Sequence, residues 1–504
     1  MNLNRQELFI VILVAIASCV SIVLVIVSGL QTSIIGTAIV VFLAIAYRYP
    51  RRGLWLFLIY MPFAGTVSYA FGSIYQAVGG YVSYSRDYAI FHLAKDAFYL
   101  PALMAIILSS QWLIKLRKNI LPLLIAILLL LVSCLLTLFL VNLSQQLSAS
   151  STDRSFLMGI VGLKILIGYI PLLFCGYYLI RDRAELNFLM RLQTTIILIC
   201  CSLCLIQYLF LSSGICPGSS SLPDPASTRV SLQARCFVGG SLLYNPAKKL
   251  ISLPGTFVAP WQWAWFLISS SFFSFAAFVN ESVLRWRIIN FVTISLVLIA
   301  AIISGQTTAT LLVPIIYLVL LLVTESNKTK LGLKLGIALL LLILVANNLG
   351  VFGSAFDSII ARWNYTPPQS FIVEQFQWIT QDGIKPLGYG LGRAASAARK
   401  LGKIVLIETF YPRLLYEVGW LGTLLFLIVV SLVTAFGFRV YRTLQRSPLK
   451  KLTICLWIFI VLISYNTYYY PLVVEPVAIY YWFFAGVLLK LPEIIRDEGI
   501  GNRE

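Results

Sequence analysis

The sequence predicts an all-α protein, a polytopic bundle of transmembrane helices, from three observations. Of its 504 residues 60% are hydrophobic and 11% are charged, whereas a soluble domain carries about 25% charged residues. Apolar runs of roughly 20 residues, long enough to cross about 30 Å of hydrocarbon as a helix, recur along the chain. Every second loop between these runs is rich in Lys and Arg, as cytoplasmic loops are.

The apolar runs indicate about fourteen helices that form one polytopic membrane domain, residues 1–504. The first run lacks a small-residue cleavage site behind it, so it reads as a retained helix rather than a removed signal peptide. The predicted spans are 8–28, 31–47, 53–71, 93–113, 119–141, 157–180, 191–212, 256–280, 288–304, 308–324, 331–350, 413–437, 453–467 and 472–489.

The basic loops set the predicted orientation, with both termini cytoplasmic and the protein in the inner (plasma) membrane. The net charge of +19, from 38 basic and 19 acidic residues, belongs mostly to loops that face anionic lipid headgroups. Membrane lipids are therefore expected partners, and the charge gives no indication of nucleic acid. The clusters are Arg48, Arg51 and Arg52; Lys115, Arg117 and Lys118; Arg181, Arg183 and Arg191; Arg285 and Arg287; Lys328, Lys330 and Lys334; Arg439, Arg442, Arg446, Lys450 and Lys451; and Lys490, Arg496 and Arg503.

Two long segments fall on the predicted outer side, 213–255 and 351–412, and the second is expected to be partly structured. Both are basic, against the usual preference for Lys and Arg inside, which suggests an anionic ligand. Alternatively, long loops are translocated regardless of charge, and these cations are solvated. The cations are Arg229, Arg235, Lys248 and Lys249 in the first segment, and Arg362, Lys385, Arg393, Arg399, Lys400 and Lys403 in the second.

Cysteine, histidine and intramembrane lysine give weaker signals. Cys216 and Cys236 both lie in the first outer segment, where an oxidising compartment would allow a disulfide; free thiols remain the alternative. His92 is the only histidine, so the sequence indicates no metal site. Lys164 lies inside an apolar span and fits either a functional group facing the bundle or a side chain that reaches the interface.

The second outer segment holds the informative constellation. Gly388, Gly390 and Gly392 alternate, and such a turn allows a ligand to approach the main chain closely. Arg393 follows at once, and Glu408 precedes a helix expected to begin near Arg413. Cations and a carboxylate are thus predicted to meet at one membrane boundary.

In order and spacing these residues resemble the O-antigen ligase and O-antigen polymerase superfamily of membrane glycosyltransferases. The resemblance covers about 60 residues. It consists of an arginine, a tryptophan, a P-L-x-G-x-G turn and an E-x-x-Y-x-x-x-L-x-E-x-G-x-x-G run. These are Arg362, Trp378, Pro386, Gly388, Gly390, Glu408, Tyr411, Leu415, Glu417, Gly419 and Gly422.

Two weaker motifs and two departures accompany this resemblance. GTFVAPWQWAWF at Gly255 looks like a family motif with Trp261 in place of asparagine, and SGQTTAT at Ser304 looks like another. The family often has an arginine in the latter, where this chain has Gln306 and Thr307. The ligase branch typically has histidine at the position of Glu408, which favours a polymerase-like member.

The resemblance implies transfer of a glycan from an undecaprenyl diphosphate-linked donor to a glycan acceptor at the outer face, in O-antigen or exopolysaccharide biosynthesis. The arginines Arg362, Arg393 and Arg413 would bind the diphosphate, since guanidinium matches phosphate bidentately. Glu408 would be the general base; its other reading is an exposed acid at a helix start. No metal or other cofactor is needed. Supporting residues would be Thr409, Tyr411, Glu417, Lys248 and Lys249, with Glu417 in a packing or hydrogen-bonding role.

Other function classes remain as alternatives. A nucleotide-sugar glycosyltransferase is disfavoured because the cytoplasmic loops are short and basic. A transporter or flippase of lipid-linked glycan would show internal repeats, interrupted helices and midplane charges. A non-catalytic scaffold that works with polysaccharide assembly or export proteins would keep the fold without the chemistry. Convergence of the outer cations with Glu408 would distinguish the enzyme from these.

The predicted topology can be tested by labelling. A single cysteine placed within 351–412, in a chain without its nine native cysteines, should react with a membrane-impermeant maleimide added outside intact cells. A cysteine placed within 439–451 should react only after the membrane is opened. Labelling of the 351–412 position from the cytoplasmic side alone would reverse the predicted orientation.

Overall fold

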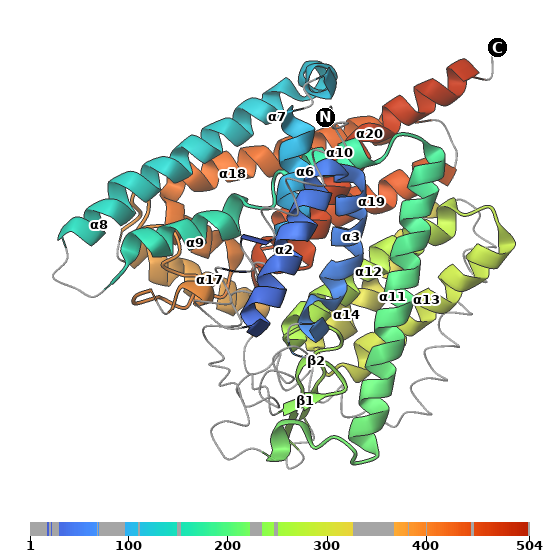
Figure 1. Cartoon of the computed structure of the whole chain (residues 1–504), viewed down its shortest axis with the longest axis horizontal. Coiled ribbons are helices and arrows are strands. Elements are labelled where there is room, and N and C mark those ends of the chain that lie inside the picture. The colour runs from blue at the N-terminus through green and yellow to red at the C-terminus, as the bar shows by residue number, and fades with distance from the viewer. Residues whose placement is uncertain are drawn as a thin grey trace. The chain divides into compact units, whose positions relative to one another are not determined.

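The computed structural model describes residues 18, 19, 22, 30–67, 69, 96–108, 111–148, 153–221, 234–245, 250–325, 367–381, 383–399, 401–444 and 448–501. Helices make up most of these residues (Figure 1). Among them nine helices are long and apolar enough to cross a membrane. The protein is thus a multi-pass helical membrane protein, while the count of about fourteen and the orientation stay predictions.

Residues 1–114 form the first of two compact units. It contains α2 (Leu30–Arg48), α3 (Pro50–Tyr60), the short 3-10 helix η1 (Met61–Phe63) and α6 (Asp96–Leu108). Pro50 occupies the first turn of α3, where its missing N–H and fixed φ are tolerated. The rings of Phe57 and Tyr99 pack 5.4 Å apart and join α3 to α6.

Residues 115–504 form the second unit, which carries the candidate site. It begins within α7 (Gln111–Leu136) and continues with η2 (Thr137–Asn142), α8 (Leu143–Ser148), α9 (Ser155–Ile167), α10 (Leu172–Leu179), α11 (Arg183–Ser212), η3 (Gly218–Ser221), α12 (Pro260–Asn280), α13 (Leu284–Ile303) and α14 (Thr307–Thr324). It ends with α17 (Pro368–Gln381), η6 (Ser396–Ala398), α18 (Phe410–Thr443), α19 (Pro448–Tyr465), η7 (Pro471–Val473) and α20 (Val477–Gly501).

The core of the second unit is built around α12 and α20, whose apolar spans are 83% and 72% buried. Small residues allow α20 to approach α10 closely. A Cβ at Gly176 would lie 2.1 Å from the carbonyl oxygen of Phe483, and one at Gly486 would lie 1.9 Å from that of Leu173. Such contacts are typical of helix pairs in membranes. The hydrophobic effect does not drive helix association in lipid, so close van der Waals packing, which small residues allow, drives it instead.

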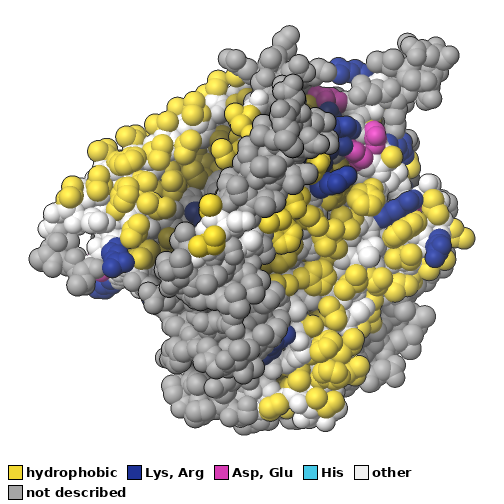
Figure 2. Space-filling model, viewed as in Figure 1, with side chains coloured by type: hydrophobic (Ala, Val, Ile, Leu, Met, Phe, Trp, Pro, Cys, Tyr) yellow, Lys and Arg dark blue, Asp and Glu magenta, His cyan; other side chains and the backbone are white. Residues whose placement is uncertain are grey.

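Helix α7 shows the opposite pattern, with many large apolar side chains exposed (Figure 2). Leu128 is 59% exposed, while Leu123 and Leu130 on the same helix are fully buried. An apolar surface on a membrane helix is satisfied by lipid rather than by protein. This face of α7 is therefore suited to contact hydrocarbon.

Within the described residues of 213–255, two small antiparallel sheets pair β1 (Arg235–Cys236) with β2 (Val238–Ser241) and β3 (Leu243–Asn245) with β4 (Leu250–Ser252). Cys216 and Cys236 form a disulfide, one of the two alternatives that the sequence left open. Gln207 at the end of α11 donates to the carbonyls of Cys236 and Val238 at 2.9 and 2.8 Å. The segment is thereby anchored to the membrane bundle.

The packing of α10 on α20 can be tested by filling it. Gly486→Ala places a methyl group where the Leu173 carbonyl now lies, so the helices must separate, at a cost of about 1–3 kcal/mol. The purified variant should unfold at a clearly lower temperature in a fluorescence-based melt. Leu128→Ala, on the exposed face of α7, serves as control and should melt near the parent; equal melting of all three proteins would contradict the close approach.

Candidate active site

The site is organised by a break in α18. Gly419 interrupts the helix with φ 71° and ψ −173°, a conformation that is open to glycine but strained for other residues. The break deprives the carbonyls of Tyr416 and Glu417 and the amides of Trp420 and Leu421 of their helical partners. Inside a membrane such groups must be satisfied by other protein groups.

The glycine-rich turn supplies these partners. Tyr389 N donates to Tyr416 O at 2.8 Å and Gly390 N to Glu417 O at 3.2 Å. In return, Trp420 N donates to Lys385 O at 3.4 Å and Leu421 N to Pro386 O at 3.3 Å. Four backbone groups that flank the break are thus paired with one turn.

The alternating glycines are needed for this docking. Gly388, Gly390 and Gly392 all have positive φ, between 69° and 113°. A Cβ at Gly388 would lie 2.6 Å from Gly419 N, and one at Gly392 would lie 2.2 Å from the carbonyl oxygen of Met158. The close backbone approach at Gly388 and Gly392 is thus made to the protein itself, and the approach of a ligand to this turn stays a prediction.

A second element, at the end of α7, holds the other side of the turn. Asn142 is fully buried and closes the π-helical segment η2, a type of irregularity common at functional sites. Its amide accepts from Leu391 N at 2.9 Å and donates to Leu391 O at 3.0 Å. Thr137 and Gln145 donate to the carbonyls of Leu387 and Tyr389. The turn is therefore clamped between η2–α8 and the broken α18.

Arg393 is part of this clamp. Its guanidinium donates to Gln145 Oε1 from both Nε and Nη2, at 3.3 and 2.8 Å, and to Asp153 Oδ2 at 3.3 Å. It also donates to Ser155 Oγ at 2.8 Å and to Lys403 O at 3.2 Å. These five bonds use all five N–H donors of arginine. The arrangement favours a positioning role for Arg393 over direct contact with a diphosphate.

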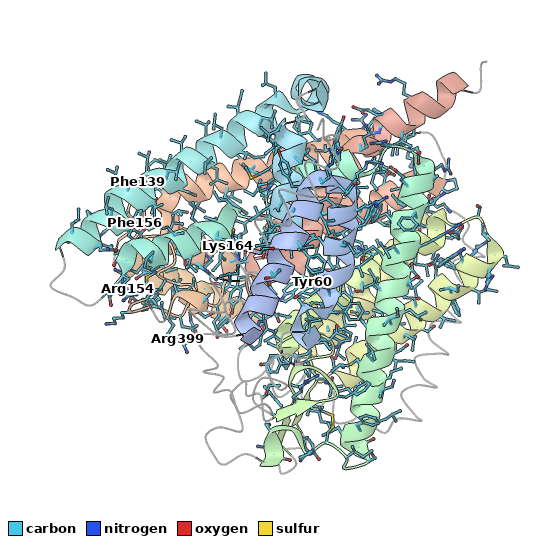
Figure 3. All side chains as sticks on the ribbon, viewed as in Figure 1. Tyr60, Phe139, Arg154, Phe156, Lys164 and Arg399 are labelled. Carbon is cyan, nitrogen blue, oxygen red and sulfur yellow. A yellow bond between two sulfur atoms is a disulfide. The ribbon has the colours of Figure 1, made fainter. Side chains whose placement is uncertain are left out.

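The clamp contacts α8 through Gln145 and α9 through Ser155, and Figure 3 labels Phe139, Arg154 and Phe156 next to these helices. Phe139 and Phe156 pack with their ring centroids 6.0 Å apart, and Arg154 N donates to Leu401 O at 2.7 Å. The guanidinium groups of Arg154 and Arg399 are exposed at the surface nearby. Lys164, further along α9, is half-buried.

Glu417 connects the turn to the first half of α18. Its Oε1 accepts from Ala394 N at 2.9 Å and pairs with Arg413 Nε at 3.4 Å. Both side chains are buried, at 9% and 5% exposure for Arg413 and Glu417. Breaking such a buried pair by removing one partner typically costs about 3–5 kcal/mol. Glu417 therefore fixes Arg413 relative to the turn.

Glu408, Arg413 and Tyr470 form a polar group at the start of α18. The Arg413 guanidinium lies 5.6 Å from the Tyr470 ring centroid. Burial raises the pKa of Tyr470, with Arg413 acting to lower it and Glu408 to raise it, so both charges act on this ring. Within the described residues the Glu408 carboxylate, the Arg413 Nη groups and the Tyr470 hydroxyl have no hydrogen-bond partner.

Thr409 belongs to the same group. It is the N-cap residue of α18, but its side chain does not cap the helix, and its buried hydroxyl is unpaired. An unpaired buried hydroxyl is costly unless a ligand or water completes it. The helix begins at Phe410, three residues before the expected start, and this places Arg413 within its first turns.

The remaining expected residues lie elsewhere. Tyr411 donates its hydroxyl to the Ser464 carbonyl and so joins α18 to α19. The motif at Ser304 lies close to the start of the motif at Gly255, since Leu253 N, two residues before Gly255, donates to Ser304 O at 3.0 Å. Arg362, Lys248, Lys249 and His92 lie outside the described residues. Across the described ranges, no group of three or more His, Cys, Asp or Glu residues could hold a metal ion.

The sequence interpretation missed three residues of this site. Asn142 and Gln145 directly follow a long apolar run, and polar amides at that position are a signal that could have been used. Tyr470 ends the run YNTYYY between two apolar spans, where aromatic residues are expected at any membrane interface. Only the contacts of Asn142, Gln145 and Tyr470 in the folded protein distinguish them from other polar or aromatic residues at the ends of apolar spans.

Comparison with known proteins adds no assignment: no protein family matches the sequence, and no curated protein matches it.

The docking of the turn on the broken helix can be tested with two glycines of similar φ. Gly388→Ala and Gly383→Ala both force alanine into positive φ, 69° and 79°, but only Gly388 faces backbone within 3 Å. Gly383→Ala should lower stability by about 1–2 kcal/mol, the cost of the conformation alone. Gly388→Ala should lower the melting temperature substantially further; equal effects of both substitutions would contradict the docking.

Proposed function

We propose that this protein is a membrane glycosyltransferase of polysaccharide biosynthesis. It transfers a glycan from an undecaprenyl diphosphate-linked donor to a glycan hydroxyl at the outer face of the membrane. The observation that carries the proposal is the arrangement at the start of α18, where the Arg413 guanidinium lies 5.6 Å from the Tyr470 ring centroid, and where the Glu408 carboxylate and the Arg413 Nη groups have no hydrogen-bond partner among the described residues. The resemblance of the surrounding motif to the O-antigen polymerase and ligase superfamily supports it.

In the proposed reaction the acceptor oxygen attacks the anomeric carbon of the donor sugar. A new C–O glycosidic bond forms while the bond from carbon to the diphosphate oxygen breaks, and its electron pair leaves with the lipid diphosphate. Glu408 takes the proton of the acceptor hydroxyl, as general bases do. Arg413 stabilises the negative charge that develops on the departing diphosphate.

The environment of Arg413 suits this role better than that of Arg393. Glu417 binds only its Nε atom, so the two Nη groups remain to bind phosphate oxygens. Glu417 also limits the rotation of the side chain, and a preorganised donor contributes more to catalysis than a mobile one. Arg393, by comparison, holds the turn on which Glu417 depends.

A transporter of lipid-linked glycan is the second candidate, and the break in α18 is the observation that favours it. Interrupted helices commonly form the binding sites of transporters, where unwound backbone groups coordinate the substrate. In this protein the backbone groups at Gly419 are paired with the 385–390 turn. They are therefore not available to a substrate, and the enzyme remains the better proposal.

The proposal can be tested with purified protein in liposomes and lipid-linked glycan extracted from the host membranes. Glu408→Gln keeps the shape of the side chain but removes the base, so the transfer rate should fall about 100- to 10,000-fold. Glu374→Gln, at an exposed position of α17, is the matched control and should retain the parental rate. A folded Glu408→Gln protein with parental transfer would remove Glu408 from the mechanism.

The arginine assignment has its own test. Arg413→Lys keeps the charge beside Glu417 but loses the planar fork, so transfer should fall by about 100-fold or more while the protein remains folded. Arg399→Lys, at an exposed arginine, is the control and should be silent. If Glu408→Gln and Arg413→Lys are both silent and glycan still crosses the membrane, the transporter candidate replaces the enzyme.

A further inference from the structure

We propose that a turn of three consecutive tyrosines, Tyr468, Tyr469 and Tyr470, binds a pyranose ring of the acceptor glycan. This tyrosine turn connects α19 to η7. The inference rests on the proposed function, and it adds a saccharide subsite to Glu408 and Arg413.

The tyrosine turn is fixed to the start of α18. Phe410 N donates to Thr467 O at 3.0 Å, and the Tyr411 hydroxyl donates to Ser464 O. Within the turn, Asn466 Nδ2 donates to Tyr468 O at 2.8 Å. The turn therefore keeps a defined position beside the residues that precede and begin α18.

Helix α17 holds the tyrosine turn and Glu408 together from another side. Phe371 packs edge-on against Tyr468, with ring centroids 6.2 Å apart. Gln375 Oε1 accepts from Glu408 N at 3.2 Å. Phe371 and Gln375 are four residues apart in α17 and share one face. One helix face thus sets the distance between the tyrosines and the proposed base.

The backbone of the tyrosine turn is strained at Tyr469, whose φ is 55°. A bulky residue rarely adopts this conformation, and it persists only where the surroundings hold it, often at functional sites. It brings the rings of Tyr468 and Tyr469 into an edge-to-face contact at 4.5 Å. All three tyrosines are half-buried, so each retains accessible surface.

The chemistry of this group matches a sugar. A pyranose presents C–H groups on its faces and hydroxyls around its edge, and the flat faces of tyrosine rings accept the former. Tyrosine also provides rigid amphipathic contact area at a low cost in conformational entropy. The Glu408 carboxylate, the Arg413 Nη groups and the Tyr470 hydroxyl are placed to bind the edge.

The position favours the acceptor over the donor as the source of this sugar. In the proposed reaction Glu408 must reach the proton of the attacking hydroxyl, at hydrogen-bond distance. The ring that carries this hydroxyl must then lie against Glu408, whose charge acts on Tyr470. The tyrosine turn is therefore the aromatic surface next to the acceptor.

Binding without turnover tests the inference. The probe is a set of oligosaccharides released by partial acid hydrolysis of the host's surface polysaccharide, with no lipid-linked donor present. Calorimetry on the purified full-length protein should show binding that is weaker by up to about tenfold for Tyr468→Leu and Tyr470→Leu, the most that the loss of one aromatic contact accounts for. Tyr470→Phe, which keeps the ring but loses the hydroxyl, should bind less weakly than Tyr470→Leu and at most about tenfold more weakly than the parent.

Tyr441→Leu, at the opposite end of α18, controls for loss of a tyrosine and should bind normally. Parental affinity in folded Tyr468→Leu and Tyr470→Leu would overturn the subsite. If these variants fail to fold, a photoreactive derivative of the same oligosaccharides is crosslinked to the parent. Attachment within 466–474 supports the subsite, and attachment only elsewhere overturns it.

Kinetics separate this inference from the proposed function. In Tyr468→Leu the KM for acceptor should rise while the KM for donor stays constant; the reverse pattern would overturn the assignment to the acceptor. Weakened oligosaccharide binding in the tyrosine variants, together with parental transfer in Glu408→Gln, would keep the sugar site and contradict the enzyme mechanism. Normal oligosaccharide binding in the tyrosine variants, together with lost transfer in Glu408→Gln, would keep the enzyme mechanism and contradict the sugar site.

Discussion

The candidate site depends on one constraint, that a helix broken within a membrane protein must still pair its backbone groups. At Gly419 two carbonyls and two amides of α18 lose their helical partners, and Lys385, Pro386, Tyr389 and Gly390 provide replacements. Unpaired, each of these groups would cost several kcal/mol in hydrocarbon. The break and the glycine-rich turn therefore stabilise one another through these hydrogen bonds.

This unit determines where the charged residues lie. The turn presents Ala394 N to Glu417, and Glu417 in turn orients Arg413. The pair is buried, so the Glu417 carboxylate rather than water balances the charge of Arg413. The Nη groups of Arg413 remain near Tyr470. In the sequence the glycine-rich turn looks like a loop that binds a ligand directly. In the structure it contacts Glu417, which positions Arg413, the residue proposed to bind the ligand.

The two described arginines of the expected diphosphate site differ in their environment. Arg393 saturates its donors with Gln145, Asp153, Ser155 and Lys403, and so joins the α8–α9 hairpin to the turn. Arg413 is held at one nitrogen only. The two arginines therefore differ in their capacity to bind an anion. Arg413 has N–H donors without a partner among the described residues, whereas Arg393 uses all of its donors within the protein.

Much of this architecture is already determined by the sequence, because hydropathy is a local property. Apolar runs specify membrane helices whatever their neighbours, and the nine described spans fall where such runs occur. The sequence also predicts that the glycines, Arg393 and Glu408 meet at one membrane boundary. Tertiary structure decided the rest: Asn142 binds Leu391 across 249 residues, and Tyr470 joins Arg413 from another helix connection. Such pairings depend on how distant segments pack, so only the folded chain could assign Arg393 to the clamp and Arg413 to the candidate site.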